Sequence, residues 1–165
     1  MTQDALRDTL GFFANTVTVV TTTHGGERFG YMSTAVAVVD FETPTLLITV
    51  NRNASSHGPI AASGCFCVNI LAESQEDISV RFTGFRGHKG EARFEGAGWT
   101  TLETGAPALQ DAVAALDCRV TQSQELGKQT LFFGRIVAAS THKKATPLLY
   151  FGRGYAAVRP LAGWG

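Results

Sequence analysis

The sequence predicts a mainly β fold in which seven or so strands, with short helical inserts, close into a barrel. Three observations support this expectation. β-branched and apolar runs of strand length recur along the chain, glycine-rich turns separate them, and the segments with helical spacing are short. A closed barrel would remove the exposed strand edges that an open sheet of this size leaves.

The first part of the chain reads as a helix followed by a hairpin. Residues 2–14, TQDALRDTLGFFA, place apolar side chains near helical spacing, with Thr2 or Asp4 as a possible N-cap. Residues 15–41 contain two β-branched runs separated by glycines at 25 and 26, which suit a turn that needs positive φ angles. A third strand is expected at 45–51, where the continuous apolar character predicts burial on both faces.

Short helices are expected to alternate with strands in the middle of the chain. Residues 54–64 read as one or two helical turns with Ser55 as a possible N-cap, and 65–71 read as a strand. A second short helix is expected at 74–84, because a serine stands at its cap position and acidic residues fill its first turn. The glycine-rich, basic stretch 84–99 is expected to be a loop.

The last third is expected to be all strand. Residues 112–126 and 128–144 have the pattern of two long, twisted strands, and 147–158 that of a turn between two short ones. With 165 residues and 44% hydrophobic content the chain is large enough for one core, so we expect a single domain over 1–165.

Composition excludes several classes of partner. The 14 basic residues balance the 14 acidic ones, so the long-range field that draws proteins to nucleic acid or to anionic membranes is missing. Three cysteines form no disulfide framework, and no apolar stretch approaches the roughly 20 residues of a membrane span. The start of the chain does not resemble a secretory signal. We therefore expect a cytoplasmic protein with no nucleic-acid and no membrane partner.

Residues 30–58 carry the strongest functional signal, because they join two strand-like runs to a polar loop. A flavin offers a carbonyl-rich ring edge and a phosphate, and this segment supplies donors suited to both: Ser33, Thr34, Asn51, Arg52, Ser55 and Ser56. The guanidinium of Arg52 follows a strand and has the reach and the bidentate geometry for phosphate. Its alternative role is a surface ion pair with Glu42 or Asp40.

Other kinds of chemistry lack their motifs. No glycine pattern fits a dinucleotide-binding turn or a phosphate loop, and there is no G-x-S-x-G elbow. Cys65 and Cys67 share one face of a strand, but zinc needs further ligands, so we expect buried cysteines and no metal site. Hydride transfer between a nicotinamide and a flavin needs orientation of two cofactors and no protein nucleophile.

The chain resembles the short-chain flavin reductases, especially the reductase components of two-component aromatic monooxygenases. The matching segments run in the family's order over nearly the whole chain: 13–22, 30–55, 66–71, 80–84, 93–99, 105–120, 132–137 and 147–155. The resemblance implies a homodimer of Greek-key split barrels that binds flavin near the subunit interface. It also implies NADH or NADPH as electron donor, FMN or FAD as acceptor, and a separate flavin-dependent monooxygenase that receives reduced flavin.

The resemblance also implies roles for individual residues. The flavin ring would be lined by Met32, Ser33, Thr34 and Ala35, and its polar edge would meet Val50 and Asn51. The phosphate would be approached by Arg52, Ser55 and Ser56, and its ribose side completed by Arg81, Phe82 and Lys89. Tyr155 lies where the family brings its C-terminal segment toward the flavin.

One segment departs from the family pattern. Many relatives carry Gly-Asp-His before the second long strand, where the histidine helps to form the nicotinamide side of the pocket, but this chain has Gly127-Lys128-Gln129. We place Gly127, Gln129 and His142 on the nicotinamide side, and Lys128 is a possible phosphate contact. Two alternatives stay open: a flavoprotein of this fold that retains FMN and reduces a substrate such as a corrinoid, or a non-catalytic flavin-binding sensor or carrier.

Overall fold

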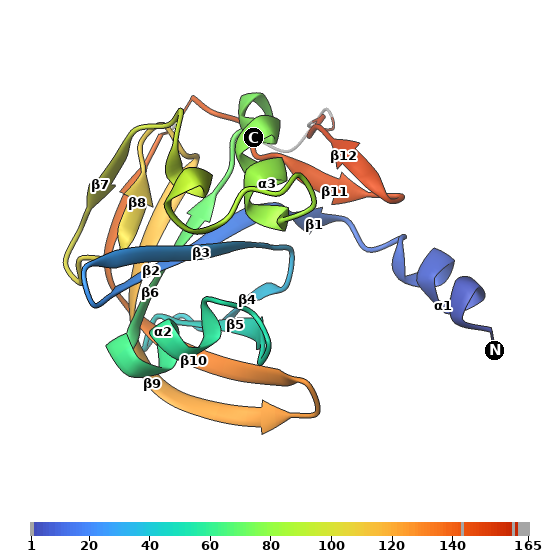
Figure 1. Cartoon of the computed structure of the whole chain (residues 1–165). Coiled ribbons are helices and arrows are strands. Elements are labelled where there is room, and N and C mark those ends of the chain that lie inside the picture. Colours follow the sequence, from blue (N-terminus) through green and yellow to red (C-terminus); the bar gives the residue numbers. More distant parts are fainter. Residues whose placement is uncertain (1, 143, 160, 162–165) are drawn as a thin grey trace.

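The structure is a computed structural model that describes residues 2–142, 144–159 and 161 (Figure 1). Its centre is a curled, seven-stranded antiparallel sheet with the order β3-β2-β6-β9-β10-β5-β4. The strands are β2 (Thr18–His24), β3 (Glu27–Ser33), β4 (Val36–Asp40), β5 (Thr45–Asn51), β6 (Cys65–Ile70), β9 (Ala114–Leu126) and β10 (Gln129–Thr141). The mainly β prediction is therefore confirmed.

Smaller elements flank this sheet. One small sheet has the order β1-β11-β12, and a two-stranded sheet pairs β7 with β8. Their bounds are β1 (Asn15–Thr16), β7 (Trp99–Thr101), β8 (Pro107–Leu109), β11 (Leu149–Phe151) and β12 (Gly154–Ala156). The helices are α1 (Gln3–Leu10), α2 (His57–Ser63), α3 (Glu76–Thr83) and the 3-10 segments η1 (Glu73–Gln75) and η2 (Gly90–Phe94). Among the described residues no helix has the length and the apolar character needed to cross a membrane.

The barrel is not closed by backbone pairing, so that part of the prediction is wrong. β3 and β4 follow each other in the chain, yet they form the two opposite edges of the sheet. At the break between β3 and β4, side chains form hydrogen bonds with main-chain groups. Thr18 Oγ1 donates to the Ser33 carbonyl at 2.8 Å, and Ser33 Oγ accepts from the Ala35 amide at 3.1 Å. Across the gap, the Tyr31 hydroxyl donates to the Thr49 carbonyl at 3.0 Å.

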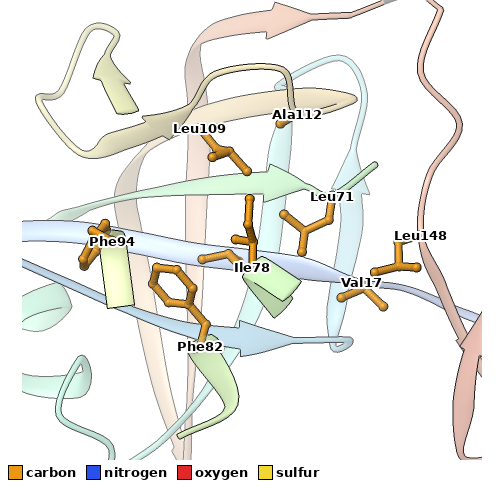
Figure 2. Close-up of a cluster of buried hydrophobic side chains, with 9 residues drawn as sticks. Val17, Leu71, Ile78, Phe82, Phe94, Leu109, Ala112 and Leu148 are labelled. Atoms are coloured by element: carbon orange, nitrogen blue, oxygen red, sulfur yellow. The ribbon is translucent and has the colours of Figure 1, made fainter. Parts of the chain in front are cut away.

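Two hydrophobic clusters lie on opposite faces of β2, so this strand is buried on both sides. Val20 belongs to the cluster inside the curled sheet, together with the inward side chains of β5 and Phe66. Val19 belongs to a second cluster, which α3 and η2 cover with Ile78, Phe82 and Phe94 (Figure 2). For β5 the expectation of two buried faces is wrong, because buried and half-buried residues alternate along it. Its outer face is only partly covered.

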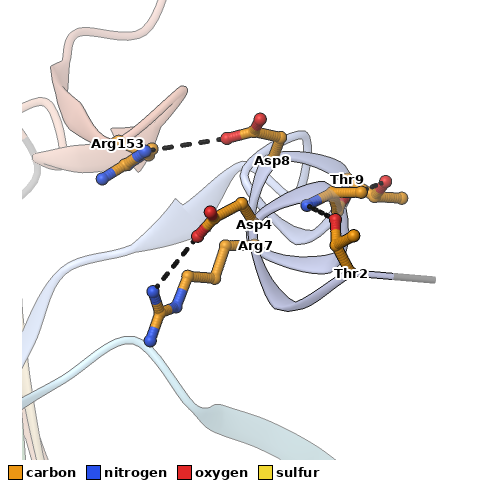
Figure 3. Close-up of polar contacts among 7 residues, drawn as sticks. Thr2, Asp4, Arg7, Asp8, Thr9 and Arg153 are labelled. Carbon is orange, nitrogen blue, oxygen red and sulfur yellow. Dashed lines mark hydrogen bonds and ion pairs between the residues drawn. The ribbon is translucent and has the colours of Figure 1, made fainter.

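The predicted helices form, and Thr2 is confirmed as the N-cap of the first, but the boundaries and the other caps differ from the expectation. Thr2 caps α1 by accepting from the Ala5 amide at 3.2 Å (Figure 3). α2 begins after Ser56, so Ser55 is not its N-cap, and α3 follows Gln75 because the preceding residues, Ser74 included, form the 3-10 segment η1. The stretch 84–99, expected to be a loop, contains η2. Of the predicted strand 128–144, residue 143 lies outside the described residues.

Helix α1 stands apart from the sheet and buries none of its residues (Figure 1). It is tied to the β11–β12 hairpin by the Asp8–Arg153 ion pair at 3.6 Å, which Figure 3 shows. In addition, the Gly152 amide donates a hydrogen bond to the Gly11 carbonyl at 2.9 Å. Phe12 and Phe151 add an edge contact with ring centroids 6.5 Å apart. Exposed ion pairs contribute little free energy, so this attachment is weak.

The curl of the sheet depends on a close approach at Gly134 of β10. A Cβ atom at this position would lie inside contact distance of the Phe66 ring and 2.9 Å from Cys118 Cβ. The pairing of β10 with β9 shifts register at this same point, between Phe133 and Gly134. A side chain larger than hydrogen would therefore push the aromatic ring out of the inner cluster.

We predict that Gly134→Ala lowers the free energy of unfolding by about 1–3 kcal/mol, because overpacking forces neighbouring side chains from their positions. Urea denaturation followed by circular dichroism measures this change. Gly58→Ala is the matched control: a Cβ at this position meets nothing within 4 Å, so stability should stay constant or rise by up to about 1 kcal/mol. Equal effects of the two substitutions would contradict the packing argument.

Candidate functional site

The β3–β4 junction and the end of β5 lie side by side, as the site prediction requires. Val36 of β4 pairs with Ile48 of β5, so the residues just before Val36 run beside the end of β5. The Tyr31–Thr49 hydrogen bond holds β3 against the same segment. Thr34 and Ala35, two of the four predicted ring contacts, therefore run beside the end of β5. Ser33 ends β3, and the Met32 side chain packs against the second cluster, under α3.

An open apolar pocket of about 320 Å³ begins at this junction. This volume is at the lower end of the range for small-molecule sites in proteins. Thr34 and Asn15 supply polar groups at its wall, and the apolar part of the lining consists of Ala14, Val36, Val38, Leu46, Val68, Ile70 and Leu116. An apolar wall with a few polar groups at its edge suits a planar ring that carries carbonyl oxygens.

The loop between β5 and α2 is tightly folded on itself. The Asn51 side chain accepts from the Asn53 amide at 2.9 Å, and the Asn51 carbonyl accepts from the Ala54 amide at 2.9 Å. Ser56, at the end of this loop, is 1% exposed. Among the described residues its Oγ is the only buried side-chain nitrogen or oxygen without a hydrogen-bond partner. A buried hydroxyl without a partner is costly, and a bound polar group would satisfy it.

Arg52 does not contact either carboxylate suggested from the sequence. Its guanidinium lies 3.1 Å from Glu125 Oε2 on β9. Asp40 instead accepts from the Glu42 and Thr43 amides within its own turn. The alternative pairing of Arg52 with Glu42 or Asp40 is therefore wrong, because a strand distant in sequence supplies a nearer carboxylate.

The residues placed on the nicotinamide side fall into two groups. Gln129 pairs with Asn51, and the Arg52 amide donates to the Lys128 carbonyl at 2.9 Å, so the turn that contains Gly127 meets the β5–α2 loop. His142 follows the far end of β10, and an extended strand of this length spans roughly 40 Å. Within one chain, His142 therefore cannot lie beside Gly127 and Gln129.

The remaining predicted residues lie around α3. Phe82 is buried and packs edge-on against Phe94 with ring centroids 5.1 Å apart, and Val50 is likewise buried in the inner cluster. Neither side chain is available to a ligand. Arg81 is half-buried and lines a polar cleft with Arg86 and His88, and Lys89 is exposed. The Tyr155 hydroxyl bonds the Ser79 hydroxyl at 2.8 Å, which fixes the C-terminal hairpin onto α3.

His57, the first residue of α2, has a structural role at this end of the sheet. Its Nε2 lies 2.8 Å from Thr130 Oγ1, and its ring packs against Phe132 with centroids 5.7 Å apart. Thr130 is buried and pairs with Val50. The partner lies 73 positions away. For this reason no local pattern could have predicted the contact.

The cysteines are unsuited to nucleophilic chemistry. Burial, more than the neighbouring Asp117, raises the pKa of Cys118 to about 12, and burial likewise raises the pKa of Cys67. Thiols with such pKa values stay protonated near neutral pH. Among residues 2–142, 144–159 and 161, no group of three or more metal-ligating side chains could hold an ion. The site therefore offers binding and orientation rather than a nucleophile.

Comparison with known proteins gives consistent results. A model of the flavin reductase like domain matches residues 10–159. The chain is 39% identical over 155 residues to the FMN reductase (NADH) RutF of Pseudomonas syringae, covering 94% of this chain and 86% of that protein.

Solved structures with similar folds also carry flavin reductase names. The NADH:FAD oxidoreductase SgcE6 of Streptomyces globisporus, solved with NAD and FAD fragments, superposes with a TM-score of 0.88 at 28% identity, covering 97% and 94% of the two chains. The styrene monooxygenase flavin reductase of Pseudomonas putida gives a TM-score of 0.83 at 26% identity, covering 94% and 97%. These likenesses confirm the predicted split-barrel fold.

Proposed function

The chain belongs to the flavin reductase like family, and from this premise we propose that it is an NAD(P)H:flavin oxidoreductase that supplies reduced flavin to a partner monooxygenase. NADH is the donor named for its relatives and FMN or FAD the acceptor. The reaction moves a hydride from the nicotinamide to the flavin, so the protein has to bind two ligands in stacked orientation.

Two observations carry this proposal: an apolar pocket that reaches Thr34, and a separate loop, after β5, that contains a buried hydroxyl without a partner. The pocket at Thr34 would take the flavin ring, and Asn51 would meet its polar edge. Ser56 Oγ, buried and without a partner, would donate to the flavin phosphate together with Ser55. These residues fit an amphipathic ligand with one apolar, one carbonyl-bearing and one anionic part.

The flavin supplies the redox chemistry when bound, and this chain's residues supply its position. Main-chain and hydroxyl donors at the β3–β4 junction would orient the ring edge. The buried thiols, held protonated, would not compete as nucleophiles. A few hydrogen bonds at an open pocket give modest affinity, which suits a reductase that must release its reduced product to a second protein.

The test is anaerobic mixing of the protein and excess FMN with NADH or NADPH. We expect multiple turnovers of flavin bleaching near about 450 nm, the usual flavin absorption band. Bleaching only when a further acceptor is added would favour a flavoprotein that retains its FMN. If the protein binds FMN but neither donor bleaches it, the result would favour a non-catalytic sensor or carrier.

Ser56→Ala tests the proposed phosphate contact. We expect the Kd for FMN to rise about tenfold or more, because a hydrogen bond to a charged group is lost, while the free energy of unfolding stays constant or rises slightly. Fluorescence titration and urea denaturation measure the two quantities.

Ser63→Ala is the control, since its hydroxyl is bonded to Thr22 Oγ1 at 2.9 Å. That substitution should cost about 1 kcal/mol of stability and leave the FMN Kd unchanged. An unchanged Kd in Ser56→Ala would remove Ser56 from the phosphate site.

We also propose that the protein is a homodimer in the cytoplasm. β4 is an edge strand on which Val38 is 54% exposed, and Phe41, just after the strand, is 87% exposed. An exposed apolar edge strand invites pairing, and a second copy would cover it beside the apolar pocket. The three free cysteines suit a reducing compartment.

Val38→Lys is expected to weaken the dimer at least tenfold, since it places a charge in the proposed interface. Sedimentation equilibrium over a range of concentrations measures this change. Val137→Lys, an exposed valine on β10, is the matched control and should leave the association constant unaltered. A monomeric wild type, or a dimer that tolerates Val38→Lys, would argue against this interface.

A further inference from the structure

A small cationic pocket lies where the β9–β10 turn meets the β5–α2 loop. It has a volume of about 160 Å³ and is lined by Arg52, Asn53, Gly127 and Lys128. This space corresponds to about five water molecules at the density of liquid water. A phosphate-sized group fits such a space better than a nucleobase.

Hydrogen bonds fix the backbones from which both cations extend. The Arg52 amide donates to the Lys128 carbonyl at 2.9 Å, and the Asn53 amide donates to the Asn51 side chain at 2.9 Å. Gly127 has φ 58° in a two-residue loop between Leu126 and Gln129, which pair with each other. Such a tight hairpin loop holds Lys128 in a defined place beside Arg52.

The electrostatic balance of the pocket favours an anion. Arg52 and Lys128 contribute two positive charges, and Glu125 contributes one negative charge through its contact with Arg52. The side chains of Arg52 and Glu125 are 47% and 66% exposed, and ion pairs with such exposure are weak. A phosphate can therefore replace Glu125 as the partner of Arg52, with bidentate geometry.

The pocket is separate from the hydroxyl site at the other end of the same loop. Neither Ser55 nor Ser56 lines it, and Ser56 is buried while Arg52 extends toward β9. The structure thus divides the phosphate donors expected from the sequence into a neutral pair of hydroxyls, of which Ser56 is buried and Ser55 exposed, and a cationic, open set. Two sets of donors can hold two phosphates.

We propose that the Arg52–Lys128 pocket binds a second nucleotide phosphate, in addition to the flavin 5′-phosphate at Ser56. This proposal rests on the proposed flavin reductase function. The shared chemistry is a phosphate carried by an adenine nucleotide, and it has two possible sources. One is the 2′-phosphate that distinguishes NADPH from NADH, and the other is the adenosine-side phosphate that distinguishes FAD from FMN.

Lys128→Asp reverses one charge of the pocket. Its effect on two ligand-preference ratios tests the proposal. One arm measures kcat/KM for NADPH relative to NADH with FMN, and the other measures the Kd of FAD relative to FMN. We expect one ratio to change about tenfold or more, to the disadvantage of the ligand with the additional phosphate, NADPH or FAD. The ratio that moves identifies the source of the phosphate.

Lys144→Asp is the matched control, because Lys144 is exposed and follows the far end of β10. It should leave both ratios unchanged. Constant ratios in Lys128→Asp, or equal shifts in both variants, would overturn the proposal.

A binding readout separates this proposal from the proposed function. Calorimetric titration with 2′,5′-ADP and with 5′-AMP needs no turnover, and neither does the flavin titration. If flavin is reduced but the ratios are constant, only the second phosphate site fails. If the wild type reduces no flavin, the reductase function fails, while a tenfold loss of 2′,5′-ADP or FAD affinity in Lys128→Asp would still support the pocket.

Discussion

A single side-chain hydrogen bond spans the place where the sheet stays open. The Tyr31 hydroxyl donates to the Thr49 carbonyl and links the edge strand β3 to β5, which backbone pairing does not join. Burial raises the pKa of Tyr31, so its hydroxyl keeps the proton that it donates. The bond lies beside the β4–β5 pairing, which carries the residues just before Val36 along the end of β5. The phenol therefore ties β3 to a segment that the strand ladder already joins to β4.

The strand pattern could be predicted from local sequence because alternation, β-branched runs and glycine turns act over a few residues. The two-sided burial assigned to β5 belongs instead to β2, since β2 contributes side chains to both hydrophobic clusters and β5 to the inner one alone. The caps of α2 and α3 each lie one residue after the expected serine, and neither Ser56 nor Gln75 makes a side-chain capping hydrogen bond that a sequence pattern could indicate. Barrel closure could not be predicted from the sequence, since it depends on whether the main-chain groups of residues 33–35 pair with a strand or form hydrogen bonds with side chains.

The site could be predicted to the extent that it is local. Thr34 comes beside the end of β5, the strand that Asn51 ends, because hairpin register follows from chain order. Arg52 with Glu125, and His57 with Thr130, join residues 73 positions apart, so the sequence could suggest only nearer partners. The separation of His142 from Gly127 was already implicit in the prediction of one long strand between them, because the ends of an extended strand lie far apart.

The contact between Gly134 and Phe66 has a consequence for how this sequence can vary over evolutionary time. Neither position is free alone, since the ring occupies the volume that a side chain on β10 would need. An increase in size at one position requires a decrease at the other. Among homologues, the two columns should therefore covary in size, with an aromatic ring at the first tied to glycine at the second.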